Sequence, residues 1–160
     1  MSMTSGRRWF IGSLLVLGVF SSSLSAQFFV QGKVVKVTDG DSVTIFSGKK
    51  KFKIRLHGID APEKAQAYSQ KSRQALSKML LNQPVRLIVR DVDRYGRLVA
   101  EIYVNELNIN LEMLLQGWAW HYTQYDDSQN YAKAQTLARL QKKGLWADSN
   151  PTPPWIFRKM

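Results

Sequence analysis

The sequence has no cysteine and only two histidines among its 160 residues. Without cysteine, the fold can depend neither on a disulfide nor on a thiolate metal site, and lipid attachment near the N-terminus is disfavoured. Acidic residues are also scarce, with 12 Asp and Glu against 23 Lys and Arg, a net charge of +11. This excess favours a polyanionic partner, and it leaves nucleic acid, an anionic membrane and a glycan all open.

Long apolar runs are missing too, apart from one near the N-terminus. Residues 9–19 are apolar or Gly except for one Ser, follow Arg7-Arg8 and precede the small residues 21–26. This order is typical of a secretory signal of the general or twin-arginine type, with cleavage expected after Ala26 or, alternatively, Ser25. The run is short for a membrane span, so an uncleaved anchor is the alternative. The sequence therefore predicts a secreted or periplasmic protein.

A single domain is expected to follow this segment. The apolar content of 44% is ordinary for a globular protein, and the chain has no internal repeat or interior linker. Residues 1–26 contain two arginines and no acid, so the rest has 21 basic and 12 acidic residues, net +9. We assign 27–148 to the domain and 149–160 to a Pro-rich C-terminal tail. The tail is expected to be extended, with Trp155 either packed on the domain or free.

Hydrophobic periodicity predicts five strands and three helices. The strands are expected at 28–37, 42–46, 51–59, 85–89 and 98–104. One helix is expected within 63–81, one from Asn110 to Gln116, and one from Ser128 to Gly144, with Asn110 and Ser128 as candidate N-caps. This pattern alone predicts an α+β fold with an antiparallel barrel or sheet.

Three polar stretches lie where these strands end. Arg55, Asp60 and Glu63 fall within nine residues at a turn that Pro62 enforces. That spacing on its own would fit a surface ion pair closing a hairpin. Two further stretches add more carboxylates, a second arginine and a tyrosine: Asp39-Gly40-Asp41-Ser42 and Asp93-Arg94-Tyr95-Gly96-Arg97.

The combination of D-G-D-S, R-L-H-G-I-D-A-P-E and D-R-Y-G-R, in that order, resembles the staphylococcal nuclease (thermonuclease) family. The resemblance runs from about Val30 to Trp146. It implies a five-stranded OB-fold Greek-key β-barrel with about three α-helices. It also implies a calcium-dependent nuclease that cuts DNA and RNA, single-stranded or locally opened, with little sequence preference and leaves 3′-phosphate ends. A monomer is expected.

The resemblance assigns the metal and the phosphate sites. Asp41 and Asp60 match the family's calcium aspartates, and the backbone carbonyl of Ala61 matches a third ligand. Ca²⁺ takes about six to eight oxygen ligands, so water and substrate phosphate would complete the shell. From the residues alone, aspartates in turns more often cap backbone N–H groups. Arg55 and Arg97 match the arginines that hold the scissile phosphate, for which a planar guanidinium is well suited.

The resemblance also assigns Glu63 as the general base. The residues leave open whether Glu63 takes a proton from water, orients that water, or is simply an acid at the start of a helix. Tyr95 and Tyr122 match positions that contact substrate and could stack on a nucleotide, while Tyr125 is left open. His57 and His121 are expected to be structural.

A non-catalytic OB-fold nucleic-acid-binding module is the alternative function. Degenerate relatives of that kind lose the arginines or acids, whereas this chain keeps Arg55, Glu63, Arg97 and both aspartates. A membrane- or glycan-binding polycation would need none of these carboxylates. The lysines at 49–51 and 53 are expected either to be solvated charges on a hairpin or to bind phosphate.

Overall fold

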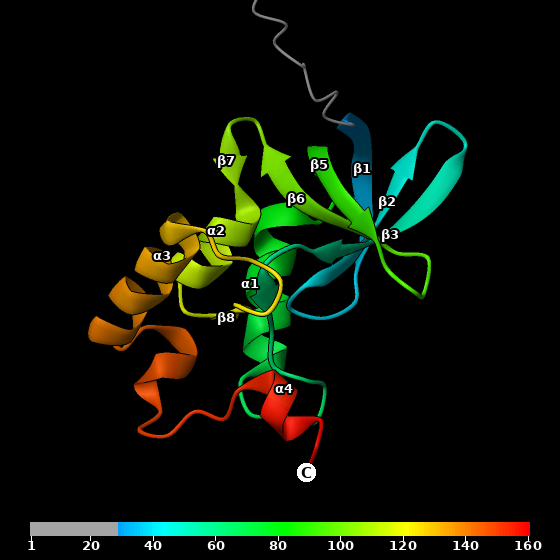
Figure 1. The fold of residues 1–160 in the computed structure, drawn as a ribbon. Coiled ribbons are helices and arrows are strands. Elements are labelled where there is room, and N and C mark those ends of the chain that lie inside the picture. The colour runs from blue at the N-terminus through cyan, green and yellow to red at the C-terminus, as the bar shows by residue number, and fades with distance from the viewer. Residues whose placement is uncertain (1–28) are drawn as a thin grey trace, which may run out of the picture.

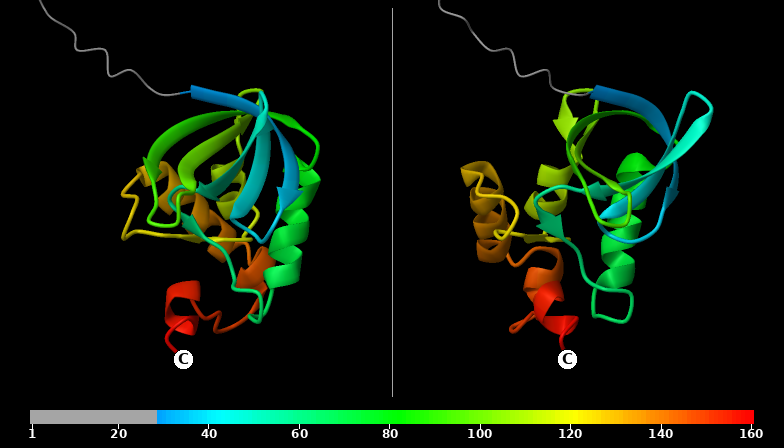
Figure 2. Two further views of the ribbon diagram at one scale, coloured as in Figure 1. Left: turned by 90° about the vertical axis from the view of Figure 1, so that its right-hand side faces the viewer. Right: turned by 45° about the vertical axis from the view of Figure 1, so that its right-hand side comes forward.

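A computed structural model describes residues 29–160, and the predicted signal segment 1–26 lies outside the described residues. Its centre is a barrel of five strands: β1 (Phe29–Val37), β2 (Ser42–Ser47), β3 (Lys50–Leu56), β5 (Pro84–Val92) and β6 (Leu98–Val104). Neighbours in the order β3-β2-β1-β5-β6 are antiparallel, and a parallel pairing of β3 with β6 closes the sheet on itself. Figure 2 shows the strands curving around this barrel. The predicted five-stranded OB-fold barrel is therefore confirmed.

Helices and short strands cover one end and one side of the barrel. They are β4 (Ile59–Asp60), α1 (Ser69–Leu80), β7 (Leu107–Asn108), α2 (Ile109–Leu115), β8 (Trp120–His121), α3 (Gln129–Leu140), a 3₁₀ helix (Gly144–Ala147) and α4 (Pro154–Phe157). In Figure 1, α2 and α3 lie next to one another, and α4 lies at the end of the molecule opposite the start of β1. No helix within 29–160 is long and apolar enough to span a membrane.

The barrel interior holds the main hydrophobic core. Alternate residues of the strands point inward and are fully or almost fully buried, as the period of two requires. They include Val43, Ile45, Ile54, Leu56, Leu87, Ala100 and Ile102, and α1 and α2 add Leu76, Leu80, Met113 and Leu114. Each fully buried Leu or Ile side chain contributes about 1.5–3 kcal/mol. This core makes the strand ends a rigid support for the polar residues that follow them.

The predicted N-cap of α2 is wrong, and α3 has the predicted N-cap residue without a capping bond from its side chain. Asn108, not Asn110, caps α2 and accepts a bond from the Leu111 N–H at 3.0 Å. Asn110 is instead fully buried and ties α2 to the barrel, because its amide donates to the carbonyls of His57 and Ala100. Ser128 at the start of α3 makes no capping bond through its side chain. The sequence offers several polar residues near each helix start, and the tertiary partners decide which one caps.

Helix α1 lies within the expected range 63–81, and the tail is only partly extended. Helix α1 starts at Ser69, so Glu63 lies in a separate turn. In that turn the Glu63 N–H donates to Gln66 Oε1 at 3.0 Å, and the Gln66 N–H donates to the Glu63 carbonyl at 2.8 Å. Glu63 is therefore not an acid of a first helical turn. The tail is extended to Pro153 and then forms α4.

Candidate active site

Asp41 is positioned by the loop between β1 and β2. A Cβ on Gly40 would lie 1.9 Å from Ser72 Oγ, so only glycine lets this loop pack so closely on α1. The Asp41 carbonyl accepts a bond from the Leu56 N–H at 2.8 Å, which fixes the loop to the end of β3. The loop is thus held by both α1 and β3, and it presents a carboxylate next to Arg55.

Arg55 joins Asp41 and Asp60. One end of its guanidinium contacts Asp41, and the other donates to Asp60 Oδ1 at 2.7 Å. The Ala61 N–H also donates to Asp41 Oδ2 at 2.6 Å. Asp41 and Asp60 are 6% and 1% exposed, so this is a buried cluster and not the surface ion pair that the spacing alone would have fitted.

The two aspartates respond differently to this burial. Burial opposes ionisation of Asp41, but the charge of Arg55 and the bond from the Ala61 N–H hold its pKa below the ordinary value. Burial dominates at Asp60 and raises its pKa, although Arg158 and Arg55 favour the charged form. The pKa of Asp39 is raised to about 6 by burial and by the charge of Asp41. The cluster therefore carries more negative charge than its buried setting easily accommodates, which suits a cation.

Arg158, from the C-terminal end of the chain, completes this cluster. It donates to Asp60 Oδ2 at 2.9 Å and Oδ1 at 3.2 Å, and to Glu63 Oε1 at 2.6 Å. The same segment is anchored by Gln66, whose amide donates to the Thr152 carbonyl at 2.5 Å. Neither Gln66 nor Arg158 was expected at the site, because neither belongs to a motif. Gln66 reaches Thr152, and Arg158 reaches Asp60 and Glu63, through contacts between residues distant in sequence.

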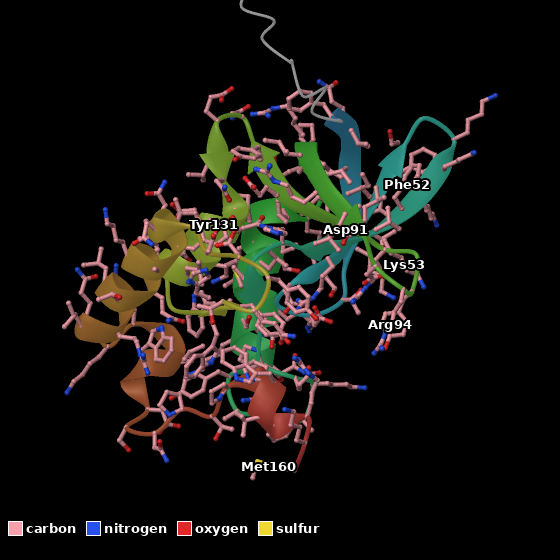
Figure 3. The ribbon with its side chains drawn as sticks, viewed as in Figure 1. Phe52, Lys53, Asp91, Arg94, Tyr131 and Met160 are labelled. Atoms are coloured by element: carbon pink, nitrogen blue, oxygen red, sulfur yellow. The ribbon has the colours of Figure 1, made fainter. Side chains whose placement is uncertain are left out.

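The turn between β5 and β6 carries Arg97 and Tyr95. Arg97 donates through Nε to Asp93 Oδ2 at 2.6 Å, and its backbone N–H also donates to Asp93. Burial acts to raise the pKa of Asp93, but the bonds from Arg97 and from the Tyr95 N–H together hold it below the ordinary value. Tyr95 is 68% exposed, and the Arg94 guanidinium lies 4.9 Å from its ring centroid. In Figure 3, Arg94 and Lys53 are labelled on the same side of the molecule.

Tyr122 faces the cleft from the residue after β8, but one of its faces is covered. The ring of Trp155 stacks on it with centroids 5.2 Å apart and planes inclined by 4°. Tyr125 approaches Tyr122 edge-on at 4.9 Å and is itself 62% exposed. The two tyrosines thus form one aromatic patch, and the C-terminal tail lies against it.

All the predicted site residues line one cleft of about 1190 Å³. They are Asp41, Arg55, Asp60, Ala61, Glu63, Tyr95, Arg97 and Tyr122, and Tyr125 and Arg158 lie beside them. Seven cationic side chains line the same cleft: Arg55, Lys64, Arg73, Arg90, Arg94, Arg97 and Arg158. An extended polyanion could follow such a cleft while its reacting group lies at the buried cluster.

The two histidines share one carboxylate away from this cluster. His121 is 3% exposed, and its Nε2 lies 2.8 Å from Asp126 Oδ1. His57 Nδ1 lies 3.8 Å from Asp126 Oδ2, and Asp126 Oδ1 also accepts a bond from Ser128 Oγ at 2.8 Å. This arrangement links the turn after β3 to the start of α3, which is a structural role.

The donors at the cluster suit a hard cation. Asp41, Asp60 and the Ala61 carbonyl offer oxygen ligands of the kind that Ca²⁺ and Mg²⁺ prefer. No group of three His, Cys, Asp or Glu side chains suited to a metal occurs in residues 29–160. Water and phosphate would therefore have to complete the shell. Both Asp60 oxygens already accept bonds from arginine, so a cation bound there would compete with Arg158.

Comparison with known proteins points to one family. The sequence model of the family described as staphylococcal nuclease homologue matches residues 53–148, which include Arg55, Asp60, Glu63 and Arg97 but not Asp41. A protein of Haemophilus influenzae described as an uncharacterized endonuclease is 47% identical over 128 residues, covering 79% of this chain and 72% of its own.

Two further relatives agree with this match. A protein of Escherichia coli O157:H7, also described as an uncharacterized endonuclease, is 39% identical over 145 residues, covering 90% of this chain and 94% of its own. A staphylococcal-like nuclease of Arabidopsis thaliana is 44% identical over 110 residues, covering 69% of this chain but only 34% of its own.

Proposed function

This chain belongs to the staphylococcal nuclease family, and we propose that it is a calcium-dependent nuclease that hydrolyses phosphodiester bonds of DNA and RNA with little sequence preference. One observation carries this proposal. Asp41, from the loop between β1 and β2, meets Arg55, Asp60 and Glu63 of the stretch 55–63 in the cleft that Arg97 also lines. A module that only binds nucleic acid would not need the two buried aspartates, nor Glu63 held beside them in a fixed turn.

Arg55 and Arg97 would hold the attacked phosphate from two sides. In-line attack increases the negative charge on the phosphate oxygens, and fixed cations stabilise that charge in the transition state. Arg55 is held rigidly by two aspartates, and burial does not prevent it from staying charged, since Asp41 and Asp60 raise its pKa. Arg97 is 29% exposed and held through one nitrogen by Asp93, which leaves its other N–H groups for phosphate.

Glu63 would accept a proton from the attacking water. Its side chain is 39% exposed and its backbone is fixed by Gln66, so it can reach solvent from a defined position. As water adds to phosphorus, the bond to the 5′-oxygen breaks, and that oxygen takes up a proton from solvent. The products are a 3′-phosphate end and a 5′-hydroxyl.

Asp41, Asp60 and the Ala61 carbonyl would hold Ca²⁺, which would neutralise charge on the attacked phosphate. Ala61 has no side-chain hydroxyl, so only its carbonyl can contribute. The Ala61 N–H also orients Asp41 through its bond to Oδ2.

The substrate would be a single strand or a locally opened duplex. Tyr95 and the Tyr122–Tyr125 patch flank the cluster in the same cleft and offer aromatic faces to unpaired bases. Contacts to phosphate through arginine carry no sequence information, which fits low sequence preference. We further propose that the protein acts as a monomer after export, with a mature N-terminus near Gln27 that mass spectrometry of the exported protein would locate.

The proposal is tested by incubating the purified protein with plasmid DNA and with RNA in Ca²⁺, Mg²⁺ or a chelator. We expect cleavage of both in Ca²⁺, 3′-phosphate ends, and none in chelator. Asp41→Ala should abolish Ca²⁺ binding, and Glu63→Gln should keep nucleic-acid binding but lose rate, because an amide cannot accept the proton. Full activity of the folded wild type in chelator would exclude the calcium mechanism, and full activity of Glu63→Gln would exclude the base.

A further inference from the structure

The C-terminal tail, residues 151–160, lies across the proposed site. Pro154 is buried, and the Thr152 carbonyl is bonded to Gln66 in the same turn that holds Glu63. Trp155 contacts both Tyr122 and Trp120, at centroid distances of 5.2 and 5.6 Å. In Figure 1, α4 lies beside the loop that leads into α1. The tail is therefore docked on the residues that the proposed reaction uses.

Arg158 occupies the position of a cation. Its guanidinium contacts both oxygens of Asp60 and one oxygen of Glu63, at 2.6 to 3.2 Å. A divalent ion on Asp60 would need the same oxygens, and water activated by Glu63 would need the same carboxylate. A guanidinium can neutralise these acids, but it cannot act as a Lewis acid toward phosphate or water. While Arg158 is bound there, the metal site is filled by the chain itself.

Trp155 occupies the position of a base. Its ring lies nearly parallel to that of Tyr122, in the offset arrangement that aromatic pairs favour. A nucleobase stacking on Tyr122 would use a face of the same ring. The tail thus brings a cation to the acids and an aromatic ring to the tyrosine, as a metal ion and a nucleotide together would.

Part of the contact between the tail and the acids is exposed, although Asp60 in that contact is buried. Arg158 and Glu63 each have side chains that are 39% exposed, and ion pairs of that kind contribute little in salt solution. Helix α4 has only four residues and is the last element of the chain. A tethered group of this type competes through its high local concentration and not through intrinsic affinity.

We infer that the C-terminal tail is a built-in competitor of the active site, in which Arg158 competes with the divalent cation and Trp155 competes with a nucleobase. This inference depends on the proposed function, since it assumes that a cation and a nucleic acid bind at this cleft. It predicts that the free protein is less active at low Ca²⁺ than it would be with the tail undocked. It also predicts that Ca²⁺ and substrate together release the tail.

The first test measures Ca²⁺ binding by isothermal titration calorimetry, without substrate and at low ionic strength. Arg158→Gln removes the competing charge, and Lys159→Gln removes the same charge from the neighbouring exposed residue. If the tail is docked in about nine molecules of ten, Arg158→Gln should lower the apparent Kd about tenfold. Lys159→Gln should match the wild type, and the difference should shrink as salt weakens the exposed pair.

The possible outcomes separate the inference from the proposed function. Equal Ca²⁺ affinity of Arg158→Gln, Lys159→Gln and wild type would overturn the inference and leave the nuclease proposal standing. Weaker binding by Arg158→Gln would also overturn it, because Arg158 would then support the metal site. If no protein binds Ca²⁺, the calcium site itself is wrong and the inference is overturned with it.

The second test concerns Trp155. Fluorescence polarisation of a labelled single-stranded oligonucleotide of mixed sequence, in chelator to prevent cleavage, compares Trp155→Ala with Trp155→Phe. The alanine variant frees Tyr122 and should bind several-fold tighter, while phenylalanine keeps a ring on Tyr122 and should stay close to the wild type. Equal binding by the two variants would overturn the part played by Trp155.

Discussion

Two regions of the molecule each bring an arginine to the same cleft and have an aromatic residue close to it. The turn between β5 and β6 brings Arg97 and Tyr95, and the C-terminal tail brings Arg158 and stacks Trp155 on Tyr122 of the cleft. Arg97 pairs with Asp93 inside its own turn, four residues away. Arg158 pairs instead with Asp60 and Glu63, which are more than ninety residues distant in the chain.

The difference shows how the location of a partner decides what an arginine does. The turn satisfies part of Arg97 locally and leaves Tyr95 68% exposed, so both remain available to a ligand. In the tail, Arg158 bonds to acids that a ligand would use. Trp155 stacks on the tyrosine that a ligand would use. Under the proposed function, the turn would receive substrate, whereas the tail would occupy the places of the cation and of a base.

The largest effect is expected at Arg55, the arginine between the two regions. Arg55→Ala leaves Asp41 and Asp60 without their buried partner, which should cost about 3–5 kcal/mol of unfolding free energy. Turnover should also fall, by on the order of 10². Urea unfolding and cleavage rates measure the two effects. Arg86→Ala, which removes an exposed pair with Glu106, is the matched control and should change stability by less than about 1 kcal/mol.

The next effect contrasts the arginines of the two regions directly. Arg97→Ala should lose on the order of 10² in turnover at saturating Ca²⁺, because a transition-state contact is removed. Arg158→Gln should keep its turnover there, because the cation has already displaced the tail. Steady-state kinetics on single-stranded DNA would decide. An equal loss of turnover in both variants would show that Arg158 is part of the catalytic machinery. Arg97 and Arg158 would then not differ in role.

The aromatic residues of the two regions should have opposite effects on nucleic-acid affinity. Tyr95→Ala should weaken oligonucleotide binding by about 1–3 kcal/mol if one base stacks on this ring. Trp155→Ala should strengthen binding, as argued above. Tyr95→Phe keeps the ring and serves as the control for the lost hydroxyl. A Tyr95→Ala variant with unchanged affinity would show that the turn does not contact the bases.

The smallest effect concerns pH and the turn. The pKa of Asp93 is lowered in the folded protein by its bonds to Arg97 and Tyr95. Its contribution to stability is therefore complete above the ordinary value of about 3.9 and is lost as pH falls through that value toward the folded pKa. Asp93→Asn should lack this pH-dependent part, so its thermal unfolding curve should approach that of the wild type as pH falls from about 5 to 2. Parallel curves would contradict the assignment.

Local patterns were sufficient where neighbours in the chain decide the structure. The strand 98–104 was predicted with the bounds it has, and the motif residues come together in one cleft as expected. Asn110 was wrongly predicted as the cap of α2, because its amide finds partners in the barrel that no local pattern reveals. Ser128 is the N-cap residue of α3 as predicted, but its hydroxyl donates to Asp126 and makes no capping bond. Gln66 bonds both to Glu63 and to the tail, which holds Glu63 in a turn before α1.

The sequence by itself determined the strands and the family, because alternating apolar residues and compact motifs act over a few residues, and the barrel followed from the resemblance to that family. Only the tertiary structure decided that Asp41 and Asp60 are buried around Arg55, and that Arg158 and Trp155 cover the acids and Tyr122. The physical reason is that the environment of a charge is set by everything packed around it. Arg158 has no local signal of its own, and its contacts appear only where the folded chain brings it to the carboxylates of Asp60 and Glu63.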